Sequence, residues 1–284
     1  MSIAWNNLKT VFLLGTLTAL LVVVGAQWGR EGMTIALIFG GMMNLGAWFF
    51  SDKIAIAAMR GREVDLQSAP DLVGAVDRLR QRANLPMPKV YICPHDAPNA
   101  FATGRNPRHA AVAVTQGAMK LLDQRELEGV LAHELAHIKH RDTLISCVAA
   151  TMAGVLAWIA QWGFFMVGGR RSEGSNPLVM IVTVIVAAIA AAMIKAMISR
   201  SREYAADAGG AEIAGEPDGL INALRKLESY SKRIPLKQPN PAQNNLFIVE
   251  PFTGSKTLVN MFATHPPTEL RIRELEKMRP GFNV

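Results

Sequence analysis

Charged residues are scarce in this chain of 284 residues: 19% are Asp, Glu, Lys or Arg, while 50% are hydrophobic. Soluble domains are usually about a quarter charged, so this composition excludes intrinsic disorder and favours a membrane protein. Cysteine is limited to Cys93 and Cys147. Cys147 lies inside an apolar run, so we expect no disulfide scaffold and no need for an oxidising compartment.

Positive charge is in modest excess, with 30 Lys and Arg against 23 Asp and Glu, a net charge of +7. Nucleic-acid binding would explain such an excess, but basic residues beside membrane segments explain it more simply. We therefore expect a lipid bilayer as partner and no nucleic acid.

Four stretches lack charged residues over the roughly 20 residues that a membrane-spanning helix needs. They lie at about 10–29, 32–51, 143–169 and 174–194, and the apolar character of the last continues past Lys195, so that the predicted span covers about 174–199. They predict two transmembrane hairpins, within residues 1–51 and 143–199. A cleaved signal peptide is the alternative for the first stretch, but the second stretch follows at once.

The flanking charges predict the orientation of these hairpins. Ten Lys and Arg residues flank one side, whereas only Arg30, Arg170 and Arg171 flank the other. The positive side is cytoplasmic by the positive-inside rule. Both termini and the polar blocks 52–142 and 200–284 are therefore expected in the cytoplasm.

The first polar block predicts an α+β domain. Ser68 can cap a helix whose first turn holds Pro70 and Asp71. Turn residues then separate three β-like runs. We expect these runs to form a small antiparallel sheet; they are Lys89–Cys93, Asn99–Thr103 and Ala110–Thr115.

A further helix carries a metal-binding pattern. Asp123 and Glu126 form a capping-box start, and the helix continues through His133-Glu134-Leu135-Ala136-His137. In this H-E-x-x-H pattern the two imidazoles share one helical face and can bind one zinc ion. Glu134 can then act as the general base toward a water at the metal. A chance occurrence of the pattern is the alternative.

A catalytic zinc needs a third protein ligand and one open position. His140 is the nearest candidate but lies on a neighbouring helical face. We therefore interpret it as a helix-end residue or as one that supports a metal ligand. Glu203 is the better candidate, and Asp207, four residues later, can orient a ligand histidine. In isolation, a solvated acidic face or an Arg202–Glu203 surface pair would be the simpler interpretation.

The predicted topology favours Glu203. His137 lies just before the second hairpin and Glu203 just after it. Both ends of a transmembrane hairpin return to the same membrane face, so the two residues are expected to be close in space. From the helical rise, the metal would lie on the order of 10 Å from the membrane surface.

These motifs together resemble the HtpX family of membrane zinc metalloproteases, relatives of the CAAX prenyl endopeptidases. The resemblance covers nearly the whole chain, although Leu270 stands where relatives often carry a charged residue. The matching segments are His133–His137, Arg202–Asp207, Ala263–Ile272 and Asn99–Gly104.

The resemblance implies a gluzincin-type site with one zinc per chain. His133, His137 and Glu203 would be the ligands, Glu134 the catalytic base and Asp207 a support for a ligand.

Two further residues of the carboxy-terminal motif have open roles. His265 would stabilise the oxyanion, or else cap the helix that starts at Pro266-Pro267. Arg271 would pair with Asp207, support His265 or form a surface salt bridge.

The segment Asn99–Thr103 resembles the family's substrate-facing edge strand, with Asn99, Ala100, Phe101 and Ala102 as candidate substrate-binding residues. An extended peptide can add to such an edge through main-chain hydrogen bonds. An ordinary buried strand is the alternative. Residues 234–262 are rich in Pro and Asn, and we expect an extended or mobile connection there.

The resulting hypothesis is a multi-pass endopeptidase of the bacterial inner membrane. The resemblance implies stress-linked quality control, with misfolded membrane proteins or unfolded polypeptides as substrates and possible cooperation with other membrane quality-control proteases. A processing protease for one dedicated substrate and a non-catalytic zinc-bound scaffold are the alternatives. A channel is disfavoured because the spans hold almost no ionisable residues. The basic flank after His137 argues against cleavage within the bilayer.

Overall fold

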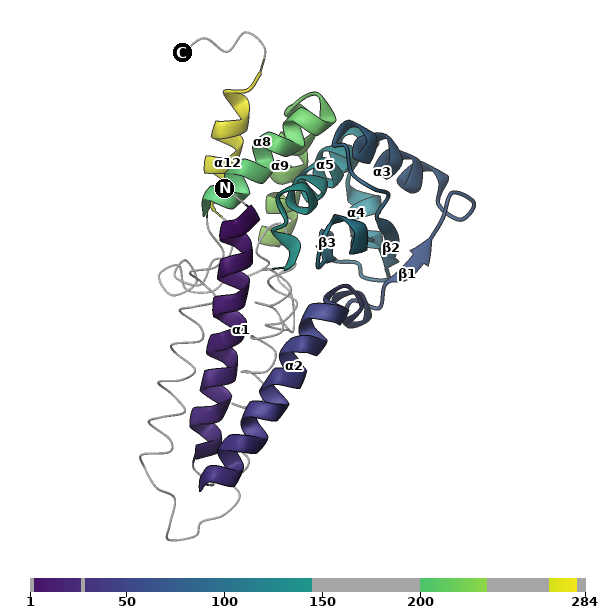
Figure 1. The fold of residues 1–284 in the computed structure, drawn as a ribbon. Coiled ribbons are helices and arrows are strands. Elements are labelled where there is room, and N and C mark those ends of the chain that lie inside the picture. Colours follow the sequence, from purple (N-terminus) through teal and green to yellow (C-terminus); the bar gives the residue numbers. More distant parts are fainter. Residues whose placement is uncertain (1–2, 27–28, 145–199, 234–265, 280–284) are drawn as a thin grey trace.

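The computed structural model describes residues 3–26, 29–144, 200–233 and 266–279. Helices dominate, and four short strands form one sheet (Figure 1). The elements are α1 (Ile3–Gly25), α2 (Gly29–Ala58), β1 (Arg62–Val64), α3 (Pro70–Arg82), β2 (Lys89–Cys93), β3 (Ala100–Gly104), the 3-10 turn η2 (Pro107–His109), β4 (Ala110–Thr115), α4 (Gln116–Leu121), α5 (Gln124–His140), α8 (Arg200–Ala214), α9 (Asp218–Arg233) and α12 (Thr268–Glu276).

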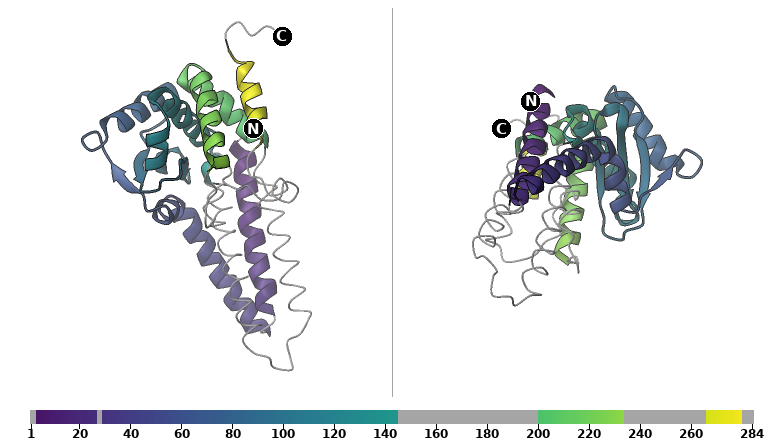
Figure 2. Two further views of the ribbon diagram at one scale, coloured as in Figure 1. Left: turned by 180° about the vertical axis from the view of Figure 1, so that it is seen from behind. Right: turned by 60° about the horizontal axis from the view of Figure 1, so that its bottom comes forward.

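Helices α1 and α2 form a hairpin that extends away from the sheet and the other helices (Figures 1 and 2). The Asn44 side chain of α2 donates hydrogen bonds to the Leu14 carbonyl at 2.8 Å and to Thr18 Oγ1 at 2.6 Å, which fixes the register of the pair. The hairpin overlaps the first two predicted stretches, although α1 covers Ile3–Gly25 and α2 continues to Ala58.

Among the described helices, one stretch is long and apolar enough to cross a membrane, Gly29–Phe50 of α2. In α1, a shorter apolar stretch covers Leu14–Val23. The predicted stretches at 143–169 and 174–199 lie almost entirely outside the described residues, as does the predicted connection at 234–262. The four-span layout therefore stays a prediction.

The sheet is mixed, so the predicted antiparallel sheet is wrong. Its strand order is β1-β2-β4-β3, and β2 pairs with β4 in parallel while the two outer pairings are antiparallel. The chain passes from β2 to the far edge, forms β3, and returns as β4 between them. Short turn-rich connections suggested consecutive hairpins. The three-residue β1 is mostly exposed and gave no alternating pattern.

Strand β4 is buried on both faces, as central strands with a parallel neighbour usually are. Ala110, Val112 and Val114 belong to the main core with α3 and α5. Ala111 and Ala113 pack on the opposite face against Ile56 at the end of α2 and against Met59, which follows it. The sheet thus separates α5 from α2.

The first helix of the polar block begins one residue later than expected. Its N-cap is Ala69, with no side-chain cap, so the prediction that Ser68 caps it is wrong. The Ser68 hydroxyl instead donates to Asp65 Oδ1 at 2.7 Å within the preceding turn. That local bond competes with capping, as short polar side chains commonly do.

Helix α5 is the central helix of the chain and packs against α3, α8, α9 and β3. Its approach to α8 depends on Gly210, where an added Cβ would lie 2.9 Å from the Cα and N atoms of His133. A glycine at this position lets the two backbones come close enough to bring the side chains of α8 to His133.

We expect Gly210→Ala to force α5 and α8 apart and to lower the free energy of unfolding by about 1–3 kcal/mol, as over-packing usually does. Thermal unfolding of the full chain measures the change. Gly74→Ala in α3 is the control, because its added methyl meets only the end of the Arg78 side chain at 3.6 Å. A melting temperature for Gly210→Ala at or above that of the parent would contradict the close packing.

Candidate active site

Helix α5 carries the two histidines of the H-E-x-x-H pattern. The predicted capping box is confirmed: Asp123 Oδ1 accepts the Glu126 N–H, and Glu126 Oε2 accepts the Asp123 N–H, each at 2.9 Å. Four residues separate His133 from His137, and their Nε2 atoms face each other at 3.2 Å. The helix thus presents both imidazoles to one point.

Helix α8 brings Glu203 to the same point. Its carboxylate oxygens lie 3.6 Å from His137 Nε2 and 3.8 Å from His133 Nε2. The three ligand atoms lie within 4.8 Å of one another. His133, His137 and Glu203, which the sequence grouped, therefore meet in space.

The spacing of these atoms fits a metal ion. Tetrahedral ligands about 2.0–2.1 Å from zinc lie about 3.3 Å from one another, close to the observed separations. His140 is not part of this cluster. It is the last residue of α5, and burial lowers the pKa of its imidazole.

A buried ion pair supports the first histidine. Asp207 Oδ1 lies 3.0 Å from His133 Nδ1, the ring nitrogen that faces away from the cluster. Arg271 of α12 donates to both oxygens of Asp207, from Nε at 2.9 Å and from Nη2 at 2.7 Å. Of the three predicted roles of Arg271, the structure shows the pair with Asp207, and the arginine is 1% exposed.

Asp207 and Arg271 keep each other ionised although both are buried. Burial alone would raise the pKa of Asp207, but Arg271 and the His133 hydrogen bond outweigh burial and lower it to about 2. Burial opposes the charge of Arg271 as well, yet Asp207 and the nearby Glu203 raise its pKa. Asp207 therefore stays ionised behind His133.

Asp142 supports the second histidine, a role that its position in the sequence did not predict. Its Oδ2 lies 3.3 Å from His137 Nδ1, and the residue is buried. Burial disfavours a charged His137, but the Asp142 hydrogen bond and the charges of Glu203 and Glu134 raise its pKa to about 9. The sequence marked Asp142 only as the limit of an apolar stretch. In the structure, Arg141 caps the end of α5 with a left-handed backbone, and Asp142 follows directly after it.

The charge around the cluster favours a divalent cation. Four buried carboxylates lie in this region, from Glu134, Asp142, Glu203 and Asp207. Among the described residues, only two buried guanidinium groups offset them, Arg202 and Arg271. With both histidines neutral, as metal ligands must be, and all six of these groups ionised, two negative charges remain. Arg202 and Glu203 are both buried, so a surface pair between them is excluded.

Glu134 connects the cluster to the sheet edge. Its Oε2 accepts the backbone N–H of Ala102 in β3 at 2.7 Å. Among the described strands, β3 pairs only with β4, in the antiparallel register Ala102↔Val112. In an antiparallel pair, alternate residues direct both their N–H and their C=O away from the partner strand. The backbone groups of Ala100 and Ala102 therefore point away from β4, toward α5.

The candidate substrate-binding residues occupy this edge with buried side chains. Ala100, Phe101 and Ala102 belong to β3, whereas Asn99 precedes the strand and donates its N–H to Thr115 Oγ1 at 2.8 Å. Their role with substrate stays a prediction. His265 lies outside the described residues, and α12 follows it with Pro267 as N-cap.

Comparison with known proteins identifies the family. The sequence model of peptidase family M48 matches residues 66–279. A relative from Desulforapulum autotrophicum, named protease HtpX homolog, is 52% identical over 277 residues, which are 95% of this chain and 89% of the relative. A relative of the same name from Syntrophotalea carbinolica is 50% identical over 279 residues, covering 96% of this chain and 99% of the relative.

A solved structure shares the fold. The crystal structure of S. mikatae Ste24p aligns with a TM-score of 0.53 and 17% identity. The alignment covers 96% of this chain and 65% of the Ste24p chain, so this chain spans about two thirds of that protein. With three quarters of its length matched by the family model and half its residues identical to named relatives, the chain belongs to peptidase family M48, among the HtpX protease homologues.

Proposed function

We propose that this chain is a zinc-dependent endopeptidase that is anchored in a membrane and cuts polypeptide segments near the bilayer surface. The proposal rests on one continuous set of contacts that links the metal-ligand residues to the edge strand. His133, His137 and Glu203 converge at metal-ligand spacing, and Glu134 beside them reaches the edge strand through Ala102.

The residues of the site divide the chemical work. His133, His137 and Glu203 would hold the zinc, which supplies a Lewis acid that acidifies water and polarises a carbonyl. Glu134 takes the proton of the attacking water and returns it to the departing amine. Asp207 and Asp142 hold the two imidazoles in the orientation that leaves each Nε2 free for the metal.

The edge strand is suited to hold a substrate in extended form. The Ala102 N–H lies at this edge and reaches Glu134, and hydrogen bonds to a peptide backbone do not depend on its sequence. Broad sequence tolerance of this kind supports unfolded polypeptides and damaged membrane proteins as substrates, in stress-linked quality control. A dedicated substrate would instead require selective side-chain contacts.

The membrane anchor is supported by α2 and by the path of the chain. The apolar stretch Gly29–Phe50 has the length and composition of a span. In addition, α5 and α8 pack side by side although residues 141–199 separate them. A transmembrane hairpin that leaves and re-enters at one membrane face satisfies this constraint, with the catalytic domain in the cytoplasm of a bacterium.

Glu134→Gln tests the catalytic base. We expect the variant to bind zinc as the parent does and to lose at least about a hundred-fold in cleavage rate, the usual loss for a general base. The measurement follows casein cleavage by zinc-loaded protein in detergent, with metal content determined on the same samples. Cleavage at the parent's rate would assign the base elsewhere, and zinc loss would show that Glu134 is a ligand.

Glu203→Ala tests the third ligand, with Glu212→Ala as the control because Glu212 lies exposed on the same helix. Removing a ligand is expected to lower the zinc content of dialysed protein well below one ion per chain. The control variant should retain the parent's content. Equal zinc content in both variants would contradict the ligand assignment.

Asp142→Asn and Asp207→Asn test the supporting carboxylates. Each is expected to weaken zinc binding roughly ten- to a hundred-fold, the usual effect of removing the partner of a ligand histidine. Competition with a chromogenic chelator measures the affinity. Asp71→Asn, an exposed position in the first turn of α3, is the control. Parent-like affinity in Asp142→Asn would reduce Asp142 to a helix-end residue.

A further inference from the structure

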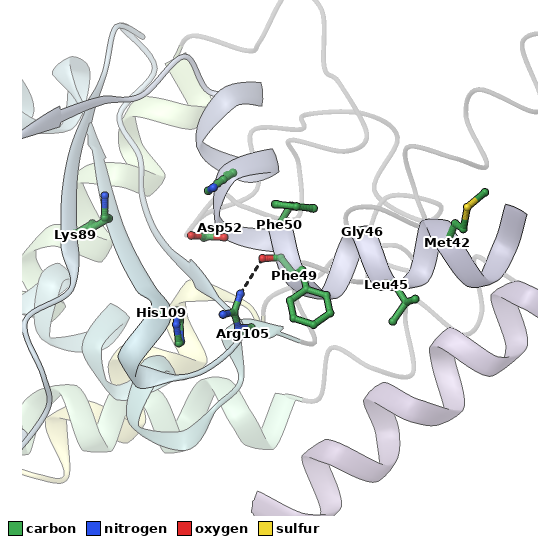
Figure 3. Close-up of a pocket in the computed structure, with 10 residues that line it drawn as sticks. Met42, Leu45, Gly46, Phe49, Phe50, Asp52, Lys89, Arg105 and His109 are labelled. Carbon is green, nitrogen blue, oxygen red and sulfur yellow. Dashed lines mark hydrogen bonds between the residues drawn. The ribbon is translucent and has the colours of Figure 1, made fainter.

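A cavity lies away from the candidate active site. Its volume is ≈ 730 Å³, and it lies between the second half of α2 and one end of the sheet (Figure 3). No residue of the metal-ligand cluster lines it. The lining is Met42, Leu45, Gly46, Phe49, Phe50, Asp52 and Lys53 from α2, with Lys89, Arg105 and His109 from the sheet end. We call it the α2–sheet pocket.

The sheet topology explains why basic residues gather in this pocket. Strands β2 and β4 run in parallel and both start at this end, while β3 runs the opposite way and finishes there. Lys89 is the first residue of β2, Arg105 follows β3, and His109 precedes β4. The mixed pairing therefore delivers three basic side chains to one place.

The other wall of the pocket is the end of the apolar stretch of α2. That stretch finishes at Phe50, where the helix is kinked, with φ −113° and ψ 15°. Arg105 Nη1 donates to the Phe49 carbonyl at 2.9 Å, and the guanidinium carbon lies 5.4 Å from the centre of the Phe49 ring (Figure 3). One turn further on, Lys53 Nζ lies 5.5 Å from the centre of the Phe50 ring.

The pocket combines exposed apolar groups with positive charge. Met42, Leu45 and Phe49 are 61%, 60% and 51% exposed. Lys89 is paired with Glu63 at 3.0 Å, but among the described residues neither Lys53 nor Arg105 forms an ion pair. Asp52 is the one acidic residue in the lining, so the pocket is positive overall.

We propose that the α2–sheet pocket binds the phosphate headgroup of an anionic phospholipid, whose acyl chains lie along Met42, Leu45 and Phe49. Arg105 donates one N–H to the Phe49 carbonyl, and its guanidinium has further N–H donors for a phosphate. Lys53 adds a second cation at the level where the apolar stretch ends. The inference rests on the proposed placement of α2 in a membrane.

The α2–sheet pocket lies on a different side of the sheet from the candidate active site, where a peptide substrate would bind. The candidate active site lies on the α5 side of the sheet, whereas α2 packs on the opposite face. A lipid held there would fix the angle between α2 and the sheet, because its headgroup would bridge Lys53 and Arg105.

Lipid binding to the full chain in detergent tests the proposal. The probes are phosphatidylglycerol, phosphatidylcholine with the same acyl chains, and inorganic phosphate, with binding followed by native mass spectrometry and by melting temperature. We expect phosphatidylglycerol to bind at least about five-fold more tightly than phosphatidylcholine, from roughly five-fold per basic residue near an anionic surface. Equal binding of the two lipids, or a phosphate effect equal to that of phosphatidylglycerol, would overturn the proposal.

Matched charge variants locate the site. Lys53→Gln with Arg105→Gln removes two charges from the pocket, and Arg108→Gln with Lys120→Gln removes two exposed charges that do not line it. The first pair should lose the preference for phosphatidylglycerol and the second should keep it. Lys53→Gln alone leaves the Arg105–Phe49 hydrogen bond intact and should lower the affinity for phosphatidylglycerol about five-fold. A preference retained in both pocket variants would overturn the proposal.

A parallel casein assay separates this inference from the proposed function. If the protein prefers phosphatidylglycerol through the pocket but does not cut casein, the lipid site stands and the endopeptidase proposal is wrong. A chain that cuts casein with zinc but shows no lipid preference would refute the lipid site alone.

Discussion

The close approach of two imidazole nitrogens and one carboxylate is the constraint on which the rest of the structure depends. At 3.2 Å, His133 Nε2 and His137 Nε2 face each other with Glu203 alongside. A divalent cation between these three groups would hold them at such separations. This geometry requires α8 to lie directly against α5, which Gly210 permits, and it requires both imidazoles to be held from behind.

The supporting charges follow from that requirement. Asp207 and Asp142 each contact the outer nitrogen of one ligand histidine, so each ring presents its other nitrogen to the cluster. Burying them is costly unless they are paired. Arg271 provides the partner of Asp207 through two hydrogen bonds, which also tie α12 to the site. The remaining excess of negative charge is what a divalent ion would neutralise.

Local patterns were readable from the sequence, and spatial neighbours were readable only where topology constrained them. The capping box at Asp123 fixed the start of α5, and the four-residue spacing fixed its metal-binding face. Glu203 was reachable because both ends of a membrane hairpin return to one face. Asp142 was missed because nothing in its neighbourhood told a helix-end carboxylate from a membrane boundary. The parallel pairing of β2 and β4 was missed because short turns specify no strand order.

The most direct test of the central claim is the X-ray absorption spectrum of the zinc-loaded full chain at the zinc edge. We expect four ligand atoms around the zinc, nitrogen and oxygen only, with the multiple-scattering features of two imidazoles. Three imidazoles would bring in another histidine such as His140, and a six-coordinate oxygen shell would mean that zinc binds elsewhere. Either result would contradict a site built from His133, His137 and Glu203.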